Sequence, residues 1–289
     1  MKDRLEYIIF ISFGFLFKIL GLKLSRRVSY LIAYLFYYII PIRKQTTIEN
    51  LTLAFPEFSK KKIREIAFGS YRSFAITLVE ILYMPNLSAE QVEKFIYSDN
   101  NDKVLERYKE NRGVILVSAH FGNWEAMAVS MGLQLKVPLS AVVKSQRNQL
   151  VSEWLNNFRS KWGNKIVPLG ISIRKVYQTI KENNIVAMVS DQRGPEDGIR
   201  VNLFGRKASV YAGTAALALR SKCPVFFCVA VRQPDYSYRT HFYEVSFDNL
   251  PVNEDERIIE ISQRHTDLLE QQVREHPEQW LWMHKRWKY

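Results

Sequence analysis

The chain has 289 residues, of which 47% are hydrophobic, and it carries a formal net charge of +12. This length supports one sizeable hydrophobic core and excludes two large domains. The basic excess indicates an anionic partner, such as a membrane surface, a lipid phosphate, an acidic carrier protein or nucleic acid. Cys223 and Cys228 lie in one predicted strand with their side chains on opposite faces, so we expect buried free thiols in a reducing compartment.

Two apolar runs, residues 7–17 and 28–42, occupy the N-terminus and are separated by basic residues. Neither run reaches the roughly 20 apolar residues that a spanning helix needs. If Lys18 and Lys23 extend their ammonium groups to the interface, residues 5–24 are long enough to span a bilayer or to lie deep in its interface. The alternative is that both runs are core helices of a soluble bundle. No small-residue cleavage pattern follows the first run, so we expect no removed signal peptide.

Residues 46–111 predict helices and their connections. Apolar residues recur at helical spacing after Ser59, which is a typical helix N-cap, and Pro85 ends this helical stretch. From residue 112 onward the chain alternates strands and helices, as α/β sheets do. Strands are predicted at 114–119, 138–144, 165–168, 185–190, 224–232 and 241–247, and helices at 124–135, 149–162, 173–182, 212–222 and 254–275.

A polar pair, His120 and Glu125, lies where the first of these strands is followed by its helix. Open α/β sheets bind ligands at the carboxyl ends of their strands. Histidine is suited to take and return a proton near neutral pH, and a carboxylate in a first helical turn stays ionised and can hold one ring nitrogen. Gly122 lets a substrate approach the backbone, and Asn123 stands at the N-cap. The pair predicts general-base catalysis; the structural alternative is a hydrogen-bonded histidine at a strand end.

The string HFGNWE, residues 120–125, resembles the His-x4-Asp/Glu signature of glycerolipid and lipid A acyltransferases. Its NWE form is similar to the branch that adds secondary acyl chains to lipid A, the Kdo2-lipid A lauroyl and myristoyl acyltransferases. Further blocks follow in the family's order, although Gln149 replaces the proline that opens the second block. The resemblance implies an α/β fold with a mixed central sheet flanked by helices. It also implies that residues 1–45 are a hydrophobic membrane anchor and residues 46–289 an acyltransferase domain.

The same resemblance implies a reaction. A fatty acyl chain would pass from an acyl-acyl carrier protein thioester, or from acyl-CoA, to a hydroxyl of a lipid A precursor in lipopolysaccharide biosynthesis. His120 would act as general base, oriented by Glu125, and backbone N–H groups or Arg159 would stabilise the oxyanion. No cofactor beyond the thioester co-substrate is implied. The expected location is the bacterial inner membrane, with the active site on the cytoplasmic side and with membrane lipids and acyl carrier protein as partners.

Other residues are assigned to substrate or oxyanion binding by this resemblance. Arg159 corresponds to the family's functional arginine, and its planar guanidinium suits a phosphate or an oxyanion. Asp191 belongs to a segment that lines the acceptor pocket, where Gly205 would allow close approach and Arg206 would attract an anionic head group. The structural alternatives are a solvated Arg159, an Asp191 that supports only the fold, and an ordinary solvated turn at Arg206. Tryptophans in the tail, residues 277–288, suit either a membrane interface or docking on the domain.

Other functional classes compete with this interpretation. A serine hydrolase is disfavoured because no G-x-S-x-G motif occurs, and metal hydrolysis because no H-E-x-x-H occurs. An acyl-CoA-dependent acyltransferase acting on another glycolipid or phospholipid stays open. A basic peripheral protein that binds membrane lipid without catalysis also explains the charge and the aromatic residues, but not the histidine and glutamate at a strand–helix junction. Nucleic acid is not expected as a partner.

Overall fold

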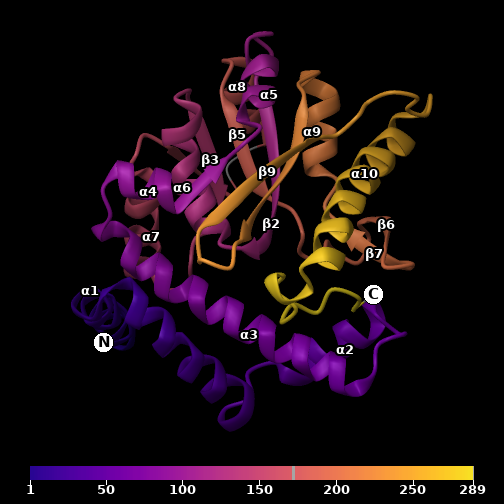
Figure 1. Cartoon of the computed structure of the whole chain (residues 1–289). Coiled ribbons are helices and arrows are strands. Elements are labelled where there is room, and N and C mark those ends of the chain that lie inside the picture. The colour runs from indigo at the N-terminus through magenta and orange to yellow at the C-terminus, as the bar shows by residue number, and fades with distance from the viewer. Residues whose placement is uncertain (171–172, 289) are drawn as a thin grey trace.

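The computed structural model describes residues 1–170 and 173–288 and contains a central sheet with helices on both faces (Figure 1). Seven strands form this sheet in the order β1-β9-β8-β2-β5-β3-β4. They are β1 Ile96–Ser98, β2 Val114–Gly122, β3 Leu139–Val143, β4 Lys165–Pro168, β5 Ile185–Val189, β8 Val225–Arg232 and β9 Tyr238–Glu244. All neighbouring pairs are parallel except β8 with β9. The predicted mixed α/β fold is therefore confirmed.

The helices are α1 Lys2–Tyr34, α2 Lys44–Ala54, α3 Lys60–Tyr83, α4 Ala89–Phe95, α5 Asn101–Tyr108, α6 Trp124–Leu135, α7 Gln149–Ser160, α8 Ile173–Lys181, α9 Gly213–Ser221 and α10 Glu254–Glu275. A π-helical turn, Leu35–Ile39, continues α1, and short 3-10 helices occupy Met84–Asn86 and Pro277–Gln279. Ser59 caps α3 as predicted, because its side chain accepts a hydrogen bond from the Lys62 backbone N–H.

Two apolar cores lie on the two faces of the sheet. Successive side chains of a strand point to opposite faces, so Ile115 and Val117 of β2 enter one core while Val114 and Leu116 enter the other. The first core packs against α3, α8, α9, α10 and the tail, and the second against α4, α6 and α7. The two cysteines fall in different cores and are buried and unpaired, which confirms the predicted free thiols.

Several strands differ from the sequence predictions, among them β2, which continues three residues beyond its predicted end to Gly122, so that His120 lies within it. β9 begins at Tyr238, earlier than predicted, because Tyr238 pairs with Arg232 of β8 and is fully buried. The short edge strand β1 was not predicted, nor was the hairpin of β6 Ile199–Leu203 and β7 Arg206–Val210. The hairpin turns at Phe204 and Gly205, which both have positive φ, a two-residue geometry that matches the twist of paired strands.

The N-terminal helix α1 is long and apolar, and it packs along α3 (Figure 1). Its direction changes at Gly21, where φ is 71°, a conformation that favours glycine. After this kink the small residues Ser25, Ser29 and Ala33 are buried and allow a close approach to α3. The boundary predicted at residue 45 falls inside α2, and the division into anchor and domain stays a prediction.

The sheet order decides which chain segments meet at the site. β2 and β5 are parallel neighbours with Ser118 opposite Val189. The residues that follow Ser118 and those that follow Val189 therefore lie side by side. In Figure 1 the carboxyl ends of both strands point to the lower edge of the sheet, where α3 also passes. The C-terminal tail joins the same edge, because the Leu281 N–H donates to the His120 carbonyl over 3.0 Å.

Candidate active site

His120 lies near the end of β2 and is held by Asp191, which follows β5. The ring Nδ1 is 2.7 Å from Asp191 Oδ1, and the His120 backbone N–H donates to Asp191 Oδ2 over 2.9 Å. Trp280 of the tail donates its indole N–H to the same Oδ2 over 2.8 Å. Because the buried carboxylate accepts at Nδ1, the neutral ring carries its proton there, which leaves Nε2 as the acceptor.

His120 and the carboxylate that holds it line a small pocket. The His120 side chain is 23% exposed, and within residues 1–170 and 173–288 no group forms a hydrogen bond with Nε2. The pocket walls come from distant parts of the chain: Asn50, Asp191, Gln192, Trp280 and Arg286 all line it. The ring nitrogen without a hydrogen-bond partner is the one that could accept a proton.

The electrostatics of the pair favour an ionised carboxylate and a more basic imidazole. Burial disfavours the charged ring, but the charge and hydrogen bond of Asp191, and then the charge of Glu125, outweigh it and raise the pKa of His120. Burial also opposes ionisation of Asp191, but His120 and the Trp280 N–H outweigh it and lower the pKa of Asp191. Asp191 is therefore an anion when His120 is neutral.

Glu125 does not hold the His120 ring, so the contact predicted between them is wrong. Both Glu125 carboxylate oxygens accept from Arg159, with Nε–Oε2 at 2.8 Å and Nη2–Oε1 at 2.5 Å. Glu125 extends from the first turn of α6 toward α7, whereas Asp191 reaches His120 from the neighbouring strand. Arg159 is buried and bidentately paired, so it is not a solvated helix residue.

Gly122 and Asn123 shape the turn after His120. Gly122 has φ of 55°, and a Cβ atom there would lie 1.9 Å from the Ala230 carbonyl oxygen, so only glycine fits. The group that approaches the Gly122 backbone closely is therefore the β8 backbone and not, as predicted, a substrate. Asn123 is fully buried, and its Oδ1 accepts from the Ala126 N–H, which caps α6. Thr77 donates its hydroxyl to the Gly122 carbonyl over 2.8 Å.

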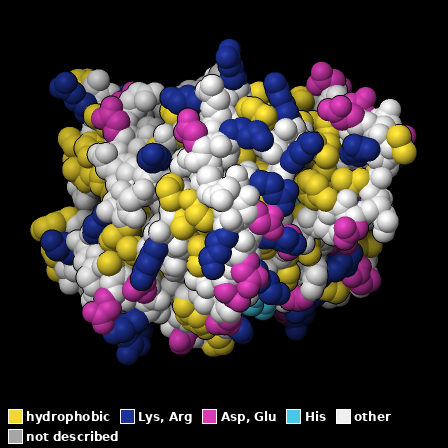
Figure 2. Space-filling view, turned by 90° about the horizontal axis from the view of Figure 1, so that it is seen from above, with side chains coloured by type: hydrophobic (Ala, Val, Ile, Leu, Met, Phe, Trp, Pro, Cys, Tyr) yellow, Lys and Arg dark blue, Asp and Glu magenta, His cyan; other side chains and the backbone are white. Residues whose placement is uncertain are grey.

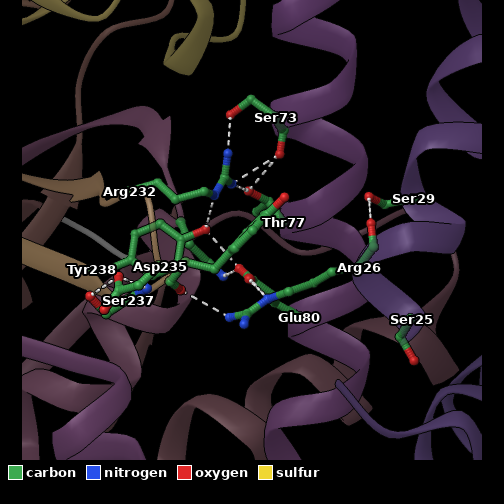
Figure 3. Close-up of polar contacts among 12 residues, drawn as sticks. Ser25, Arg26, Ser29, Ser73, Thr77, Glu80, Arg232, Asp235, Ser237 and Tyr238 are labelled. Carbon is green, nitrogen blue, oxygen red and sulfur yellow. Dashed lines mark hydrogen bonds and ion pairs between the residues drawn. The ribbon is translucent and has the colours of Figure 1, made fainter. Parts of the chain in front are cut away.

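A buried polar network supports this turn, and sequence reasoning missed it (Figure 3). Glu80 of α3 has no exposed surface and accepts from three donors, the Nε of Arg26, the Nδ2 of Asn123 and the hydroxyl of Tyr238. Arg232 donates to the Tyr238 hydroxyl and to hydroxyl groups of α3. No sequence motif predicts this network, because its residues come from elements that are far apart in the chain: α1, α3, α6, β8 and β9.

The C-terminal tail is part of the site. Trp280 and Trp282 are 3% and 1% exposed, so these two tryptophans dock on the domain and do not face a membrane. The buried Arg286 donates to the Ser209 carbonyl, and burial lowers the pKa of Arg286 to about 10, which leaves it cationic at neutral pH. The aromatic tail was visible in the sequence, but not its contact with Asp191.

Gly205 and Arg206 are not brought to His120. They lie at the turn of the β6–β7 hairpin, where Gly205 borders a second pocket beside α10 and the exposed Arg206 donates to the Leu53 carbonyl. Their predicted contact with an anionic head group stays a prediction.

Within the described chain, no group of three or more His, Cys, Asp or Glu side chains is arranged to hold a metal ion.

The model of the bacterial lipid A biosynthesis acyltransferase family matches residues 3–289. The chain belongs to this family. It is 26% identical to the lipid A biosynthesis palmitoleoyltransferase of Escherichia coli K12 over 258 residues, which are 85% of this chain and 79% of the relative. It is 24% identical to the lauroyltransferase of the same organism over 241 residues, or 83% of this chain and 77% of the relative. A phosphatidylinositol mannoside acyltransferase of Mycolicibacterium smegmatis is 21% identical over 162 residues, 55% of this chain and 53% of that protein.

These matches confirm the resemblance carried by HFGNWE, and they show that the protein is an acyltransferase. In this lipid A acyltransferase family member, the His120 site has the parts that proton abstraction from a hydroxyl requires. An imidazole that lines a pocket has one nitrogen fixed by a buried carboxylate and the other available as a proton acceptor. The first amides of α6 follow directly, and helix N-termini stabilise negative charge.

Proposed function

We propose that this acyltransferase transfers a fatty acyl chain from a thioester to a hydroxyl group of a lipid A precursor, with His120 as general base. The observation that carries the proposal is the geometry of His120, whose Nδ1 is held by buried Asp191 while its partly exposed ring leaves Nε2 without a hydrogen-bond partner among the described residues. Membership of the lipid A biosynthesis family supports the acceptor class, as do relatives named palmitoleoyltransferase and lauroyltransferase.

The reaction needs no covalent enzyme intermediate. His120 Nε2 takes the proton of the acceptor hydroxyl while its oxygen attacks the thioester carbonyl. The C–S bond of the tetrahedral intermediate then breaks, and the imidazolium returns the proton to the leaving thiolate. Asp191 stabilises the imidazolium that forms between these steps. General-base assistance of this kind contributes about 10²–10⁴ in rate.

We assign stabilisation of the oxyanion to the first backbone amides of α6. The first N–H groups of a helix have no intrahelical acceptor, and the Asn123 cap satisfies that of Ala126. One donor of this type contributes about 2.7–4 kcal/mol to the transition state. Arg159 is less suited, because Glu125 occupies its Nε and Nη2 groups. The Glu125 charge instead helps to raise the pKa of His120.

The proposed donor is acyl-acyl carrier protein, an acidic partner that the net charge of +12 would attract. The face seen in Figure 2, at the end of the sheet away from His120, carries many basic side chains, several of them close together, with acidic ones scattered around them. We propose that the carrier approaches the His120 edge, because its thioester has to reach that residue. No cofactor takes part in the proposed reaction. Such donors are made in the cytoplasm, which supports an active site on the cytoplasmic side of the inner membrane.

A second acceptor class is supported by the mycobacterial relative. That protein is named a phosphatidylinositol mannoside acyltransferase, so a related chain acylates a glycolipid other than lipid A. The same His120 chemistry would serve such an acceptor with acyl-CoA as the donor. The identity and coverage are lower for this relative than for the lipid A enzymes, which favours lipid A.

The test is acyl transfer by the purified protein in detergent. A Kdo-bearing tetra-acyl lipid A precursor and a phosphatidylinositol mannoside would each be incubated with acyl-acyl carrier protein and acyl-CoA of several chain lengths, and products followed by mass spectrometry. We expect one added acyl mass on the lipid A precursor, reduced about 10²-fold or more in His120→Ala. His241→Ala, which changes a histidine of β9 outside the site, is the matched control and should stay active. Full transfer by His120→Ala would contradict the mechanism, and transfer only to the mannoside would replace the acceptor.

A further inference from the structure

Most of the large apolar side chains that the described residues expose to solvent lie in the first 42 residues. Within the described chain, Lys2–Ile39 is the one helical stretch long and apolar enough to cross a membrane, with 11% of its most hydropathic window buried. Its exposed members include Leu5, Ile8, Phe15, Ile19, Leu31 and Ile39. Length and composition alone allow this stretch either to span a bilayer or to lie along its surface.

The first turns of α1 are attached to the folded domain at the start of α7. Glu6 forms an ion pair with Arg147 at 2.7 Å. Asn148, which also caps α7, donates from Nδ2 to the Asp3 carbonyl over 2.8 Å. The N-terminal end of α1 therefore lies beside polar groups of the catalytic domain.

The same face of α1 keeps contact with the domain toward the kink. Phe10 packs edge-on against Trp154 of α7, with the ring centroids 5.0 Å apart. Gly14 lies against Leu82 of α3, which a Cβ atom at that glycine would meet at 3.7 Å. Phe17 is 2% exposed. Together with the polar contacts at residues 3 and 6, these positions recur every three or four residues, so they form one stripe along the helix.

The part of α1 after the kink is attached more firmly (Figure 3). Arg26 donates from Nε to the buried Glu80 over 2.8 Å and from Nη2 to the Tyr236 carbonyl over 2.9 Å. Small buried residues on the same side let the helix pack closely on α3. Both segments of α1 thus rest on the same domain.

These contacts conflict with a spanning helix. Residues 2–20 are about 28 Å long at 1.5 Å per residue, close to the roughly 30 Å thickness of the hydrocarbon core. A helix that crossed the core would have its two ends in opposite interfaces. The N-terminal end contacts Arg147 and Asn148, so crossing would carry a charged side chain and a helix N-terminus of the domain through the bilayer.

We propose that α1 binds the membrane in the plane of one leaflet and does not cross it. The outward apolar side chains enter the acyl boundary of a bilayer that contains anionic lipids, while the stripe described above stays on the domain. Exposed basic residues along and just beyond the helix suit anionic head groups: Lys2, Arg4, Lys18, Lys23, Arg27 and Arg43. This inference rests on the membrane location in the proposed function, but it concerns topology and is tested without acyl transfer.

An in-plane helix has a consequence for the site. α1 packs on α3, and Thr77 of α3 binds the Gly122 carbonyl next to His120. The catalytic edge of the sheet is therefore held near the leaflet surface from which a lipid acceptor enters. The domain does not need a long tether to reach its substrate.

The first test asks whether two introduced cysteines lie on the same side of the membrane. Lys2→Cys marks the start of α1, and Val252→Cys marks the domain at a residue that is 93% exposed. Sealed inner-membrane vesicles containing either variant would be treated with a membrane-impermeant maleimide, with and without detergent. The wild type is the control, since Cys223 and Cys228 are buried. We expect both variants to be labelled from the same side; labelling from opposite sides would overturn the proposal.

The same experiment distinguishes whether α1 crosses the membrane from the side of the membrane on which the domain lies. If both cysteines are labelled only after detergent is added to inverted vesicles, the in-plane arrangement holds, but the proposed cytoplasmic location of the domain is wrong. Loss of acyl transfer in either variant does not affect this result, because labelling is measured by mass.

The second test measures binding to vesicles of phosphatidylethanolamine and phosphatidylglycerol. The double variant Ile8→Asp with Ile19→Asp places charges on the outward face of α1 without touching the stripe. We expect about a tenfold or greater loss of vesicle binding with unchanged unfolding in detergent. Val252→Asp, at an apolar residue far along the chain that is even more exposed, is the control. Unchanged binding of the double variant, or no binding by the wild type, would overturn the proposal.

Discussion

At the level of single residues, the contact between His120 and Asp191 decides how strong a base the histidine is. Burial alone would lower the pKa of the ring, and the adjacent carboxylate reverses this effect. The proposed mechanism needs the neutral ring, so the rate should fall as the pH decreases through the raised pKa of His120. The pH at which the rate falls on the acid side therefore measures how far the Asp191 contact raises the pKa of His120.

Asp191→Asn should therefore change the pH profile as well as the rate. Without the carboxylate charge, burial lowers the pKa of His120, so the acid limb of kcat should move to lower pH. The maximal rate should fall by about 10²–10⁴ because the imidazolium loses its counter-ion and the ring loses its orientation. The measurement is kcat for acyl transfer across the acid range. An acid limb that stays in place, or moves to higher pH, would argue against this role for Asp191.

Glu125 should act mainly through Arg159. Their side chains are 12% and 9% exposed, and breaking a buried pair by removing one partner costs about 3–5 kcal/mol. Glu125→Gln should thus lower the free energy of unfolding by an amount approaching this range, measured by urea denaturation in detergent. Because the Glu125 charge also raises the pKa of His120, the acid limb should move slightly to lower pH.

The matched control for Glu125→Gln is an exposed pair. Lys94 and Glu90 lie one turn apart on α4 with side chains about three-quarters exposed. Glu90→Gln should change the free energy of unfolding by about 0.5 kcal/mol or less. Equal effects at the two sites would show that the Glu125–Arg159 pair contributes no more than a surface pair.

At the level of elements, the junction of β2 and α6 depends on a turn with no room for a side chain. Gly122 combines a positive φ with a close approach to the β8 backbone, and Asn123 then starts the helix. The turn holds His120 at the strand end and the first α6 amides beside it. A change in this turn is therefore expected to alter both the free energy of unfolding and acyl transfer.

Gly122→Ala should be strongly destabilising, because its Cβ atom would overlap the Ala230 carbonyl oxygen and force the two strands apart. We expect a loss above about 3 kcal/mol in the free energy of unfolding and loss of acyl transfer. Gly213→Ala in α9, where a Cβ atom meets nothing within 4 Å, is the matched control and should be neutral or slightly stabilising. A Gly122→Ala protein as stable as Gly213→Ala would contradict the assigned role of the turn.

At the level of the whole molecule, Glu80 connects the N-terminal helix to the catalytic turn. It binds Arg26 of α1, Asn123 at the start of α6 and Tyr238 of β9, and it has no exposed surface. Arg232 supports the same cluster through Tyr238. Helix α1 and the site are thus parts of one packed unit.

Glu80→Gln should destabilise the protein because it leaves Arg26 next to an uncharged partner in a buried position. The expected cost is about 3–5 kcal/mol. Glu80→Gln should also make α1 more sensitive to limited proteolysis, since Arg26 attaches α1 to Glu80. Adding Arg26→Met should recover part of the lost stability, because the unpaired cation is removed. No change on Glu80→Gln in either measurement would contradict the coupling.

Much of the local structure could be predicted from the sequence. The β-branched run at 114–119 and the apolar spacing at 124–135 placed β2 and α6, and α10 and β4 matched their predicted bounds. Ser59 and Asn123 cap helices as their side-chain chemistry predicts. These features depend on neighbours within a few residues, so the order of amino acids is enough to specify them.

The sequence by itself thus determined that His120 lies near a strand–helix junction, that a glycine turn follows and that Glu125 lies in the first turn of the next helix. Only the tertiary structure decided which carboxylate holds His120. Asp191 is 71 residues away and reaches the ring because β5 pairs with β2, while Glu125 is drawn to Arg159. Strand order, like the burial of Glu80 and the attachment of α1 to α7, depends on packing between distant segments, and no pattern within one segment contains that information.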